Sequence, residues 1–507
     1  MTHIAQVVQK QPDAIAAIFP DSGTTLSFGA LDRAANQAAH AYRAIGLRRG
    51  DCVGIAITNR AEWLSCVLGA QRAGLYYVLL STKLSATDLA YIVENSEAAA
   101  LVISAGCFAL ETPGALDALP TRVFGIDLPE VEDWTAFAAQ MPDTLVADPS
   151  WGRVMLYSSG TTGRPKGVRK PLPGGAWDTA EPANSWIEHA YKLRPGAVLI
   201  SPSLLYHAAP HRYVLAALHS GASVVIPERF DAAQALHLIE QYRCTHGLWV
   251  PTMFHRMLQL PEQERLAADL GSMQYAIHGA APCPVHVKQR MIEWWGPIID
   301  EYYSGSEGVG FTHITSAEWL AHPGSVGRLA PGSVHILDAQ GQPLGPDMIG
   351  EIYFAGDNAF EYWRDPQKTA DSVSRQGWRT FGDIGYLDED GYLYITDRKN
   401  FTIISGGVNL YPKEIEAAIL ELPMVRDVAV FGVPDPDFGE TACAAVEVEP
   451  DVSADDALAA TILAHVRQSL GPVKTPKSLF FESALPRHDT GKLYKAELVA
   501  KYSSASK

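Results

Sequence analysis

The chain has 507 residues, of which 47% are apolar and 19% charged, and its formal net charge is −17. At roughly 150 residues per domain, this length predicts about three packed units rather than one core. The composition excludes a disordered protein, and the negative charge argues against a nucleic-acid partner, because phosphate backbones are bound by Lys/Arg-rich surfaces.

The six cysteines are scattered and form no CxxC pair. This pattern is typical of reduced thiols rather than of a disulfide or zinc framework. The N-terminus carries no apolar signal-like stretch, and no apolar run approaches the roughly 18 residues that a membrane-spanning helix needs. The sequence therefore predicts a soluble cytoplasmic protein with no transmembrane segment.

Over about the first 300 residues, helix-like and strand-like segments alternate. An Ala-rich amphipathic pattern predicts a helix over 27–45. The segments that follow are predicted at 52–57 (strand), 61–73 (helix), 79–80 (the end of a strand), 197–203 (strand), from 207 (helix), 223–227 (strand), from 232 (helix), and 245–251 and 274–279 (strands with turns). Such alternation predicts parallel sheets covered by helices, with ligands bound beyond the carboxyl ends of the strands.

The pattern changes at about residue 326. From there to about 396, short strands and turn signals predict a small β unit. Beyond residue 400 the chain is α/β again, with helices predicted at 412–420 and 455–470 and strands at 428–433 and 444–448. We place a domain boundary near Asn400.

The most informative segment is 157–168, YSSGTTGRPKGV. It interleaves small hydroxyl residues with glycines and ends on a lysine. Glycines let backbone N–H groups turn toward an anion, while hydroxyls and a lysine add donors and positive charge, so the loop suits a polyphosphate. It is not a Walker A loop, because Lys166 is followed by Gly167. Taken alone, a solvated Ser/Gly/Thr turn is equally consistent with it.

Five further segments, in order along the chain, extend this pattern. They are GAAP at 279–282, EYYSGSEG at 301–308, WRTFGD at 378–383, DRKNFTIISGG at 397–407 and LPRHDTGK at 485–492. Together with SSGTTGRPKG they resemble the motifs of the adenylate-forming superfamily, which contains acyl-CoA synthetases, peptide-synthetase adenylation domains and beetle luciferases. The resemblance covers most of the chain.

The resemblance implies a fold and a reaction. The fold is α/β, with a large N-terminal domain (1–399) of two parallel helix-covered sheets plus a small β-barrel-like unit at about 326–396. A small mobile α/β C-terminal domain (400–507) follows. The reaction is that of an AMP-forming carboxylate–CoA ligase: ATP and an acid give acyl-AMP and pyrophosphate, and CoA then gives acyl-CoA and AMP. ATP, Mg²⁺ and CoA are the implied cofactors.

The resemblance also implies roles for individual residues. Glu307 and Thr162 would hold Mg²⁺, Asp383 would accept hydrogen bonds from the ribose hydroxyls, and Lys492 would reach the reacting α-phosphate and carboxylate. With His207, which closes the acyl pocket, Glu307, Thr162 and Lys492 make the implied catalytic set. The implied nucleotide-binding residues are Ser158, Ser159, Gly160, Thr161, Thr162, Gly163, Lys166, Gly279, Ala280, Ala281, Pro282, Tyr303 (stacking on adenine), Ser304, Gly305, Ser306, Glu307, Asp383, Arg398 and Lys492.

The second half reaction needs the C-terminal domain to swing. The pivot implied by the resemblance is Asn400, where relatives usually carry Asp or Lys. Ser405, Gly406 and Gly407 would line the pantetheine tunnel. Phe438 would contact CoA, although a hairpin aromatic that covers the core is an equal reading.

The sequence departs from the family motifs at three places. Ser304 replaces a glycine, Ser306 replaces a threonine and Phe381 is inserted in the Arg-Thr-Gly-Asp motif. These departures bear on the fine geometry of the site and leave the class of reaction unchanged.

The predicted acyl pocket is mostly apolar. Its candidates are His207, Trp249, Val250, Met253, His278, Gly279, Ala280, Tyr302, Ser304, Gly305, Val309 and Phe311. No Asp or Lys stands among them to pair with a second substrate charge, which favours a plain hydrophobic acid: fatty, alicyclic, steroid-side-chain or aromatic. The segments VPTMFHRML and EYYSGSEG resemble the fatty and bulky-acid CoA ligases of bacterial catabolism. His207 and His211 lie four residues apart, but no third ligand suggests a metal site.

Two alternatives stay open. One is an acyl-AMP ligase that loads a carrier protein instead of CoA, although the segment 338–396 leaves little room for the insertion such ligases carry. The other is a nucleotide-binding pseudoenzyme that acts as an interaction protein. The joint presence of Lys166, Glu307, Asp383, Arg398 and Lys492 argues against it. A homodimer is the default expectation for the oligomeric state.

Overall fold

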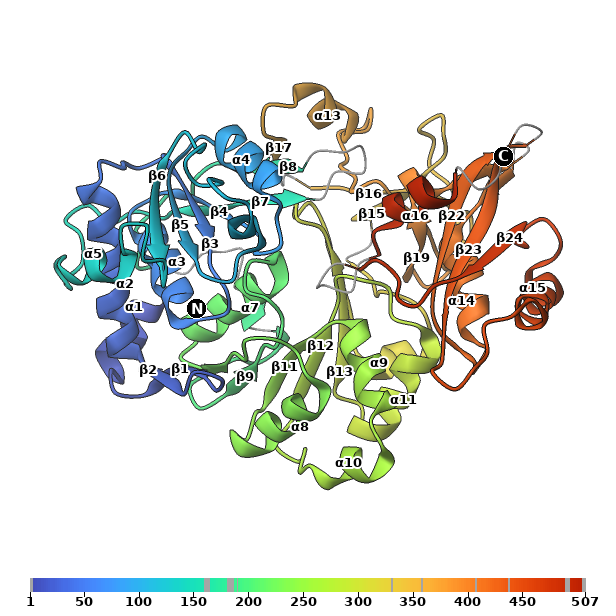
Figure 1. The fold of residues 1–507 in the computed structure, drawn as a ribbon, viewed down its shortest axis with the longest axis horizontal. Helices are drawn as coiled ribbons and strands as arrows, with labels where there is room; N and C mark the ends of the chain where they lie inside the picture. Colours follow the sequence, from blue (N-terminus) through green and yellow to red (C-terminus); the bar gives the residue numbers. More distant parts are fainter. Residues whose placement is uncertain are drawn as a thin grey trace.

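The computed structural model describes residues 3–158, 165–179, 187–188, 190–329, 332–356, 359–405, 408–435, 438–487 and 493–503. The side chains of Ser158, Asn400 and Asn409 are outside this description. Figure 1 shows two α/β units built around separate sheets, with the C-terminal part of the chain on one side of them.

The first large sheet has parallel central strands and an antiparallel strand at each edge. Its strands, in spatial order, are β14 (Phe311–Ile314), β13 (Ile299–Ser304), β12 (Tyr275–His278), β11 (His246–Trp249), β9 (Val198–Ile200), β10 (Ser223–Val225), β1 (Ile15–Phe19) and β2 (Thr24–Ser27). The parallel strands β11, β12 and β13 lie side by side, so their carboxyl ends meet at one edge of the sheet.

The second large sheet is also parallel at its centre. In spatial order its strands are β17 (Glu361–Tyr362), β8 (Lys166–Arg169), β7 (Arg153–Ser158), β4 (Tyr76–Leu79), β3 (Cys52–Ala56), β5 (Ala98–Ser104) and β6 (Arg122–Ile126). Strand β17 is distant in sequence and pairs antiparallel with β8 through Tyr362 and Val168. A segment from the predicted β-rich region therefore returns to this sheet.

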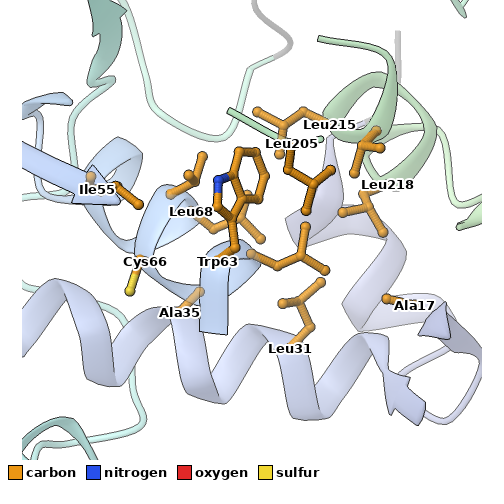
Figure 2. Packing of buried hydrophobic residues seen from close by; sticks show 14 of the residues in the cluster. Ala17, Leu31, Ala35, Ile55, Trp63, Cys66, Leu68, Leu205, Leu215 and Leu218 are labelled. Carbon is orange, nitrogen blue, oxygen red and sulfur yellow. The ribbon is translucent and has the colours of Figure 1, made fainter. Parts of the chain in front are cut away.

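Three helices lie between the two sheets: α2 (Phe28–Ala44), α3 (Ala61–Arg72) and α7 (Ala208–His219). Their buried side chains join strands of both sheets in one hydrophobic core. Figure 2 shows Trp63 of α3 in this core, surrounded by leucines of α2, α3 and α7. The Trp63 side chain is fully buried, and burying so large an apolar surface stabilises the fold through the hydrophobic effect. This helical layer therefore holds the two sheets together.

The remaining described helices cover outer faces or connect strands. On the outer face of the first sheet, α8 (Ala232–Gln241), α9 (Pro251–Gln259) and α11 (Val285–Trp295) form a second core. On the outer face of the second sheet, α4 (Ala86–Asn95) and the 3-10 turn η1 (Phe108–Glu111) form a third. The others in this part of the chain are α1 (Ile4–Lys10), α5 (Trp134–Ala139), α10 (Glu262–Ala267), α12 (Ser316–Ala321) and α13 (Pro366–Asp371).

A small antiparallel sheet follows the two large ones. Its strands are β15 (Val334–Leu337), β16 (Gly350–Phe354), β18 (Asp383–Leu387) and β19 (Leu393–Arg398). Strand β18 begins at Asp383 and pairs with β19 so that Asp383 lies opposite Arg398. The register of this hairpin therefore places two predicted site residues together.

The last described strands form a five-stranded sheet. They are β20 (Ile403–Ser405), β21 (Val408–Leu410), β22 (Val425–Asp435), β23 (Gly439–Val448) and β24 (Ser478–Phe481). The 3-10 turn η2 (Lys399–Phe401) leads into this sheet, and the helices are α14 (Pro412–Leu420), α15 (Asp456–Leu470) and α16 (Lys495–Tyr502). The expected domain boundary near Asn400 stays a prediction.

The prediction of an α/β fold with parallel sheets, a large N-terminal part and a smaller C-terminal part is confirmed.

Helix α2 starts after Ser27, whose hydroxyl accepts a hydrogen bond from the backbone N–H of Ala30, and α14 starts with Pro412 at its first turn. Strands β22 and β23 are longer than predicted, because their hairpin pairs through polar positions such as Asp427 and Glu447 as well as through the apolar run.

Within the described part of the chain, no helix combines the length and the apolar character needed to cross a lipid bilayer.

Five histidines are buried in the folded protein, and we expect them to lower its free energy of unfolding in mild acid. Burial lowers the pKa of His3 and His246 to about 4 and that of His211 to about 3, and it lowers the pKa of His219 and His278 well below the usual value. Between these values and about pH 6.5, the unfolded chain binds more protons than the folded one. Stability therefore falls as pH falls through this window, by up to about 1.4 kcal/mol per pH unit for each histidine.

Urea unfolding at pH 7, 6 and 5 measures this loss. The transition midpoint should move steadily to lower urea, and His211→Gln should make the dependence shallower. An unchanged midpoint between pH 7 and 5 would contradict the assignment of these histidines as neutral in the folded protein.

Candidate active site

The candidate site lies beyond the carboxyl ends of β12 and β13. Strand β12 ends at His278, and the predicted adenine-side segment (279–282) occupies the turn that follows. The EYYSGSEG segment begins within β13, which ends at Ser304, and residues 305–308 form the turn after it. Because β12 and β13 are adjacent and parallel, the two turns are neighbours. This is the place where open parallel sheets usually bind ligands.

A hydrogen-bonded chain joins the first large sheet to the small sheet. The Tyr303 hydroxyl donates to Asp383 Oδ2 at 2.6 Å, and Arg398 Nε lies 3.1 Å from Asp383 Oδ1. Asp383 is buried, while the Arg398 side chain is about half-exposed. Burial and the neighbouring carboxylate raise the pKa of Tyr303 well above its usual value, so its hydroxyl stays protonated as a donor.

Phe381, the residue inserted in the family motif, lies beside this chain. Its ring meets Tyr303 edge-on, with centroids 5.6 Å apart at 89°. A Cβ at position 305 would approach the Phe381 ring to 2.5 Å, so Gly305 is required for this close contact. The insertion thus packs against the Tyr303 ring and the turn after β13.

The carboxylate of Glu307 is buried and held in a fixed orientation. The hydroxyl of Tyr362 donates to Glu307 Oε1 at 2.8 Å. Burial and the Glu307 carboxylate raise the pKa of Tyr362 well above its usual value. Tyr362 belongs to β17, the strand that pairs with β8, so the second sheet supports a carboxylate carried by the first.

Two lysines lie beside the segment that carries Tyr362 and Asp365. Lys166 Nζ is 2.8 Å from Asp365 Oδ2, and Lys368 Nζ stands over the Tyr362 ring at 4.6 Å. Burial and the nearby Lys166 lower the pKa of Lys368. Asp365 balances the charge of Lys166, at the described end of the predicted phosphate loop, and Lys368 adds a positive charge beside Tyr362, the partner of Glu307.

An aromatic group forms the other side of the turn after β13. Tyr302 stacks on Phe311, with centroids 5.8 Å apart at 16°, and lies 5.7 Å from Tyr213 of α7. A Cβ at position 279 would come within 2.5 Å of the Tyr302 ring, so Gly279 permits this approach. Ser304 closes the turn by donating to the Gly310 carbonyl at 2.8 Å.

The adenine-side turn has an unusual backbone. Ala280 adopts φ +68°, a left-handed conformation that costs a non-glycine residue about 1–3 kcal/mol. Ala280 and Pro282 are exposed, and Ala281 is half-exposed. Ser306 is half-buried in the facing turn. Strain that a protein keeps in an exposed turn is typical of a ligand-binding segment.

Four predicted pocket residues lie away from the aromatic group. Trp249 packs edge-on against Trp295 on the outer face of the first sheet, and Val250 and Met253 belong to the same outer core. Val309 is buried in the core of the small sheet. Trp249, Val250 and Met253 thus lie on the opposite face of the sheet from Tyr302, and we leave these three out of the proposed pocket.

His278 also faces the outer side of the sheet. Its ring packs edge-on against Phe254, and its Nε2 lies 3.5 Å from Glu301 Oε2. The reason is the alternation of side chains along a strand: Ile277 points into the inner core, so His278 must point outward. Glu301 in turn forms a buried ion pair with Lys288 at 2.7 Å.

His207 stands at the N-cap of α7, and its ring contacts that of Tyr206 at 4.3 Å between centroids. His211, one turn later, is buried, with its Nε2 2.9 Å from the Tyr77 hydroxyl. In the described ranges, no group of three or more His, Cys, Asp or Glu side chains could hold a metal ion. The burial of His211 and its contact with Tyr77 identify it as a residue of the hydrophobic core.

The described CoA candidates lie together in the C-terminal sheet. Ser405 pairs with Gly439 across β20 and β23, next to Phe438. The Phe438 ring is 45% exposed and carries Lys477 Nζ above it at 3.8 Å. The reading of Phe438 as a covered core aromatic does not fit this exposure.

Ser159, Gly160, Thr161, Thr162, Gly163, Gly406, Gly407 and Lys492 lie outside the described residues, as do the side chains of Ser158 and Asn400.

The carboxylate of Glu307 suits a Mg²⁺ ion that is also held by substrate phosphates, rather than one held by protein ligands alone. Magnesium in nucleotide sites is usually held by one or two carboxylates together with substrate phosphates. Glu307 is such a carboxylate, buried and oriented by Tyr362, with Lys166 and Lys368 nearby. The residues present therefore fit this metal.

Sequence reasoning missed Tyr362, Lys368 and Arg212. Tyr362 lies 55 residues beyond Glu307, and no motif connects the two. Arg212 follows the His207/His211 pair and is half-buried, whereas residues 213–219 of α7 are all buried. A charged residue within such an apolar run is the one signal in the sequence that could have singled it out.

Comparison with known proteins identifies the family of the chain. The AMP-binding enzyme family matches residues 4–363, and the AMP-binding enzyme C-terminal domain matches residues 414–492. The chain is 29% identical to a long-chain-fatty-acid–CoA ligase, FadD13, from Mycobacterium tuberculosis, over 97% of this chain and 96% of the relative. It is 32% identical to a feruloyl-CoA synthase from an Amycolatopsis species, over 94% of each chain.

Among solved structures, ATP-bound MatB from Rhodopseudomonas palustris is 29% identical and superposes with a TM-score of 0.84 over 99% of both chains. The chain therefore belongs to the AMP-binding enzyme family and, as an ATP-dependent ligase that forms carbon–sulfur bonds, to its AMP-forming acyl-CoA ligases.

Proposed function

We propose that this chain converts a hydrophobic carboxylic acid, ATP and CoA into acyl-CoA, AMP and pyrophosphate. The observation that carries the proposal is the convergence of two linked pairs, Tyr303–Asp383 and Tyr362–Glu307, around the turn after β13. One pair suits a ribose and the other a metal-bound polyphosphate.

The first half reaction joins two anions. A carboxylate oxygen of the acid attacks the α-phosphorus of ATP, and pyrophosphate leaves. Both reactants and the transition state are negatively charged, so the site must supply positive charge. Lys166, which pairs with Asp365 at the described end of the loop, and Lys368 of α13 would supply part of this charge. Mg²⁺ would add charge beside Glu307, and Lys492 is the proposed partner of the reacting groups.

The second half reaction forms the thioester. The CoA sulfur, after losing its proton, attacks the acyl carbonyl carbon of the adenylate, and AMP leaves. Ser405 and Phe438, with Gly406 and Gly407, are the proposed CoA contacts. The exposed Phe438 ring beside Lys477 suits a ligand that combines an apolar chain with phosphate groups.

The apolar body of the acid would lie against the Tyr302, Phe311 and Tyr213 rings, with His207 at the entrance to the pocket. Aromatic faces accept aromatic or alicyclic rings and aliphatic chains alike. The two relatives described above are named for a long-chain fatty acid and for a feruloyl group, so the family by itself leaves the acid open.

Pyrophosphate release by the purified protein with ATP, Mg²⁺ and a panel of carboxylic acids, with and without CoA, tests the proposal. Sustained release that needs both one class of acid and CoA is the expected result. A single burst that CoA does not prolong would point instead to a carrier-protein acceptor. No release with any acid would refute the proposal.

The role of Asn400 as a pivot gives a separate prediction. Asn400→Pro should leave the pyrophosphate burst within about twofold and lower acyl-CoA formation strongly, because proline fixes φ and blocks a hinge rotation. Asn400→Ala, which keeps backbone freedom, is the matched control. Equal losses in both half reactions would count against a pivot at this residue.

A cytoplasmic location and a homodimer stay predictions from the sequence. Cell fractionation and sedimentation analysis would test them.

A further inference from the structure

Two cationic side chains from different elements converge on Gly308, the residue after Glu307. Lys170 follows β8, and its Nζ donates to the Gly308 carbonyl at 3.2 Å. Arg212 comes from α7, between the two large sheets. A Cβ built on Gly308 would lie 2.8 Å from Lys170 Nζ and 3.7 Å from Arg212 Nη2. Both positive groups therefore stand within 4 Å of one point.

Arg212 directly precedes Tyr213 on α7, and the Tyr213 ring lies 5.7 Å from that of Tyr302. Burial raises the pKa of Tyr302 to about 12 and that of Tyr213 well above its usual value, and the positive charge of Arg212 opposes both shifts. The positive charge of Arg212 thus acts on two of the rings proposed to hold the acid. Its helix also carries His207 at the N-cap, the residue proposed for the pocket entrance.

The backbone around these cations is well held. The Tyr76 hydroxyl donates to the Lys170 carbonyl at 3.0 Å, and Gly308 N donates to the Gly305 carbonyl at 3.0 Å. Like charges at such a distance repel, and an anion placed beside both is stabilised by both. The planar guanidinium fork of arginine matches the two oxygens of a carboxylate.

We propose that Arg212, with Lys170 beside it, forms a subsite for a second carboxylate, so that the preferred acid is a dicarboxylic acid with an apolar ring or chain between its two acid groups. The inference rests on the proposed function and refines its substrate class. One carboxylate is activated beside Glu307, the apolar body lies on Tyr302 and Phe311, and the second carboxylate meets the guanidinium.

Matched pairs of acids test the proposal through kcat/KM for pyrophosphate release. Suitable pairs are 3-phenylpropanoate with 3-(2-carboxyphenyl)propanoate and hexanoate with adipate. The wild-type protein should prefer the diacid in at least one pair. Arg212→Met should lower kcat/KM for that diacid by about 10- to 100-fold, as expected for the loss of hydrogen bonds to a charged group. It should change the monoacid by less than about threefold and leave KM for ATP unchanged.

Two further variants separate charge recognition from structure. Arg212→Lys keeps the charge but loses the planar fork, and its diacid preference should fall between wild type and Arg212→Met. Arg169→Met is the matched control: Arg169 stands over the Tyr76 and Trp363 rings, at 4.2 and 3.8 Å, and should not affect the diacid-to-monoacid ratio. Because the readout is a ratio within one variant, partial unfolding does not imitate the expected result.

Three outcomes overturn the inference. A wild-type preference for the monoacid in every pair refutes it and leaves the proposed function intact. A raised KM for ATP in Arg212→Met, equal for all acids, assigns the guanidinium to the phosphates of ATP instead. No pyrophosphate release with any acid refutes the proposed function and this inference together.

Discussion

Glu307→Gln is expected to lower the rate of adenylate formation by about 10²- to 10³-fold, the usual cost of removing one electrostatic group from a transition state. The amide has nearly the same shape as the carboxylate, and its oxygen can still accept the hydrogen bond from Tyr362. What it loses is the negative charge that would hold Mg²⁺ against the phosphates. The fold should therefore be preserved while the chemistry fails.

Single-turnover pyrophosphate release, measured over a range of Mg²⁺ concentrations, checks this expectation. The variant should need more Mg²⁺ for half-maximal rate. Tyr362→Phe removes only the hydroxyl that orients Glu307, and a loss of about tenfold is expected from one hydrogen bond to a charged group. Glu361→Gln, an exposed neighbour on β17, is the control and should behave as wild type. A Glu307→Gln variant that forms adenylate normally but fails with CoA would contradict the role.

Lys288→Met is expected to destabilise the folded protein by about 3–5 kcal/mol, the cost of leaving a buried charge without its partner. The Lys288 side chain is fully buried, and its Nζ lies 2.7 Å from Glu301 Oε2 and 4.9 Å from the centre of the Trp319 ring. Glu301 begins the segment that carries Tyr302, Tyr303 and Glu307. Loss of the pair should therefore also loosen the site.

The pH dependence of this variant has a definite sign. Burial raises the pKa of Glu301, and Lys288 opposes that rise. Without the lysine, the folded-state pKa rises further, so the folded protein holds a proton that the unfolded chain has released above about pH 4.3. The deficit in the free energy of unfolding should therefore grow as pH rises above this value and shrink toward it.

Urea unfolding of the single and double variants measures the effect. Adding Glu301→Gln to Lys288→Met should recover a large part of the lost stability, because no buried charge then remains. Lys10→Met, at an exposed lysine on α1, should leave the midpoint unchanged. A Lys288→Met variant as stable as wild type would show that Glu301 is protonated in the native protein or reached by water.

The family and the positions of several site residues followed from the sequence alone. The ordered motifs located Tyr303, Glu307, Asp383 and Arg398, and the structure brings the first, third and fourth into direct contact. Local signals also located elements well: Ser27 at the start of α2 and Pro412 at the start of α14 act within one turn of the helix. Such effects depend only on neighbouring residues, so the start of a helix can be recognised from the sequence before the fold is known.

The face of the sheet on which each pocket candidate lies was decided by the tertiary structure. Alternation along a strand fixes that Ile277 and His278 point to opposite sides. It does not fix which side faces the acid, because both faces of a parallel sheet are covered by helices. Only the packing of α7 on one face and α9 on the other places Tyr302 inside and Trp249 outside.

Contacts between segments that are distant along the chain could not be predicted from the sequence either. Tyr362 reaches Glu307 because β17 returns to pair with β8, and Arg212 and Lys170 meet at Gly308 because α7 lies between the two sheets. The sequence by itself determined the family, the class of reaction and the local elements. The contact of Tyr362 with Glu307 and the approach of Lys170 and Arg212 to Gly308 depend on long-range packing, which no interaction between neighbouring residues specifies.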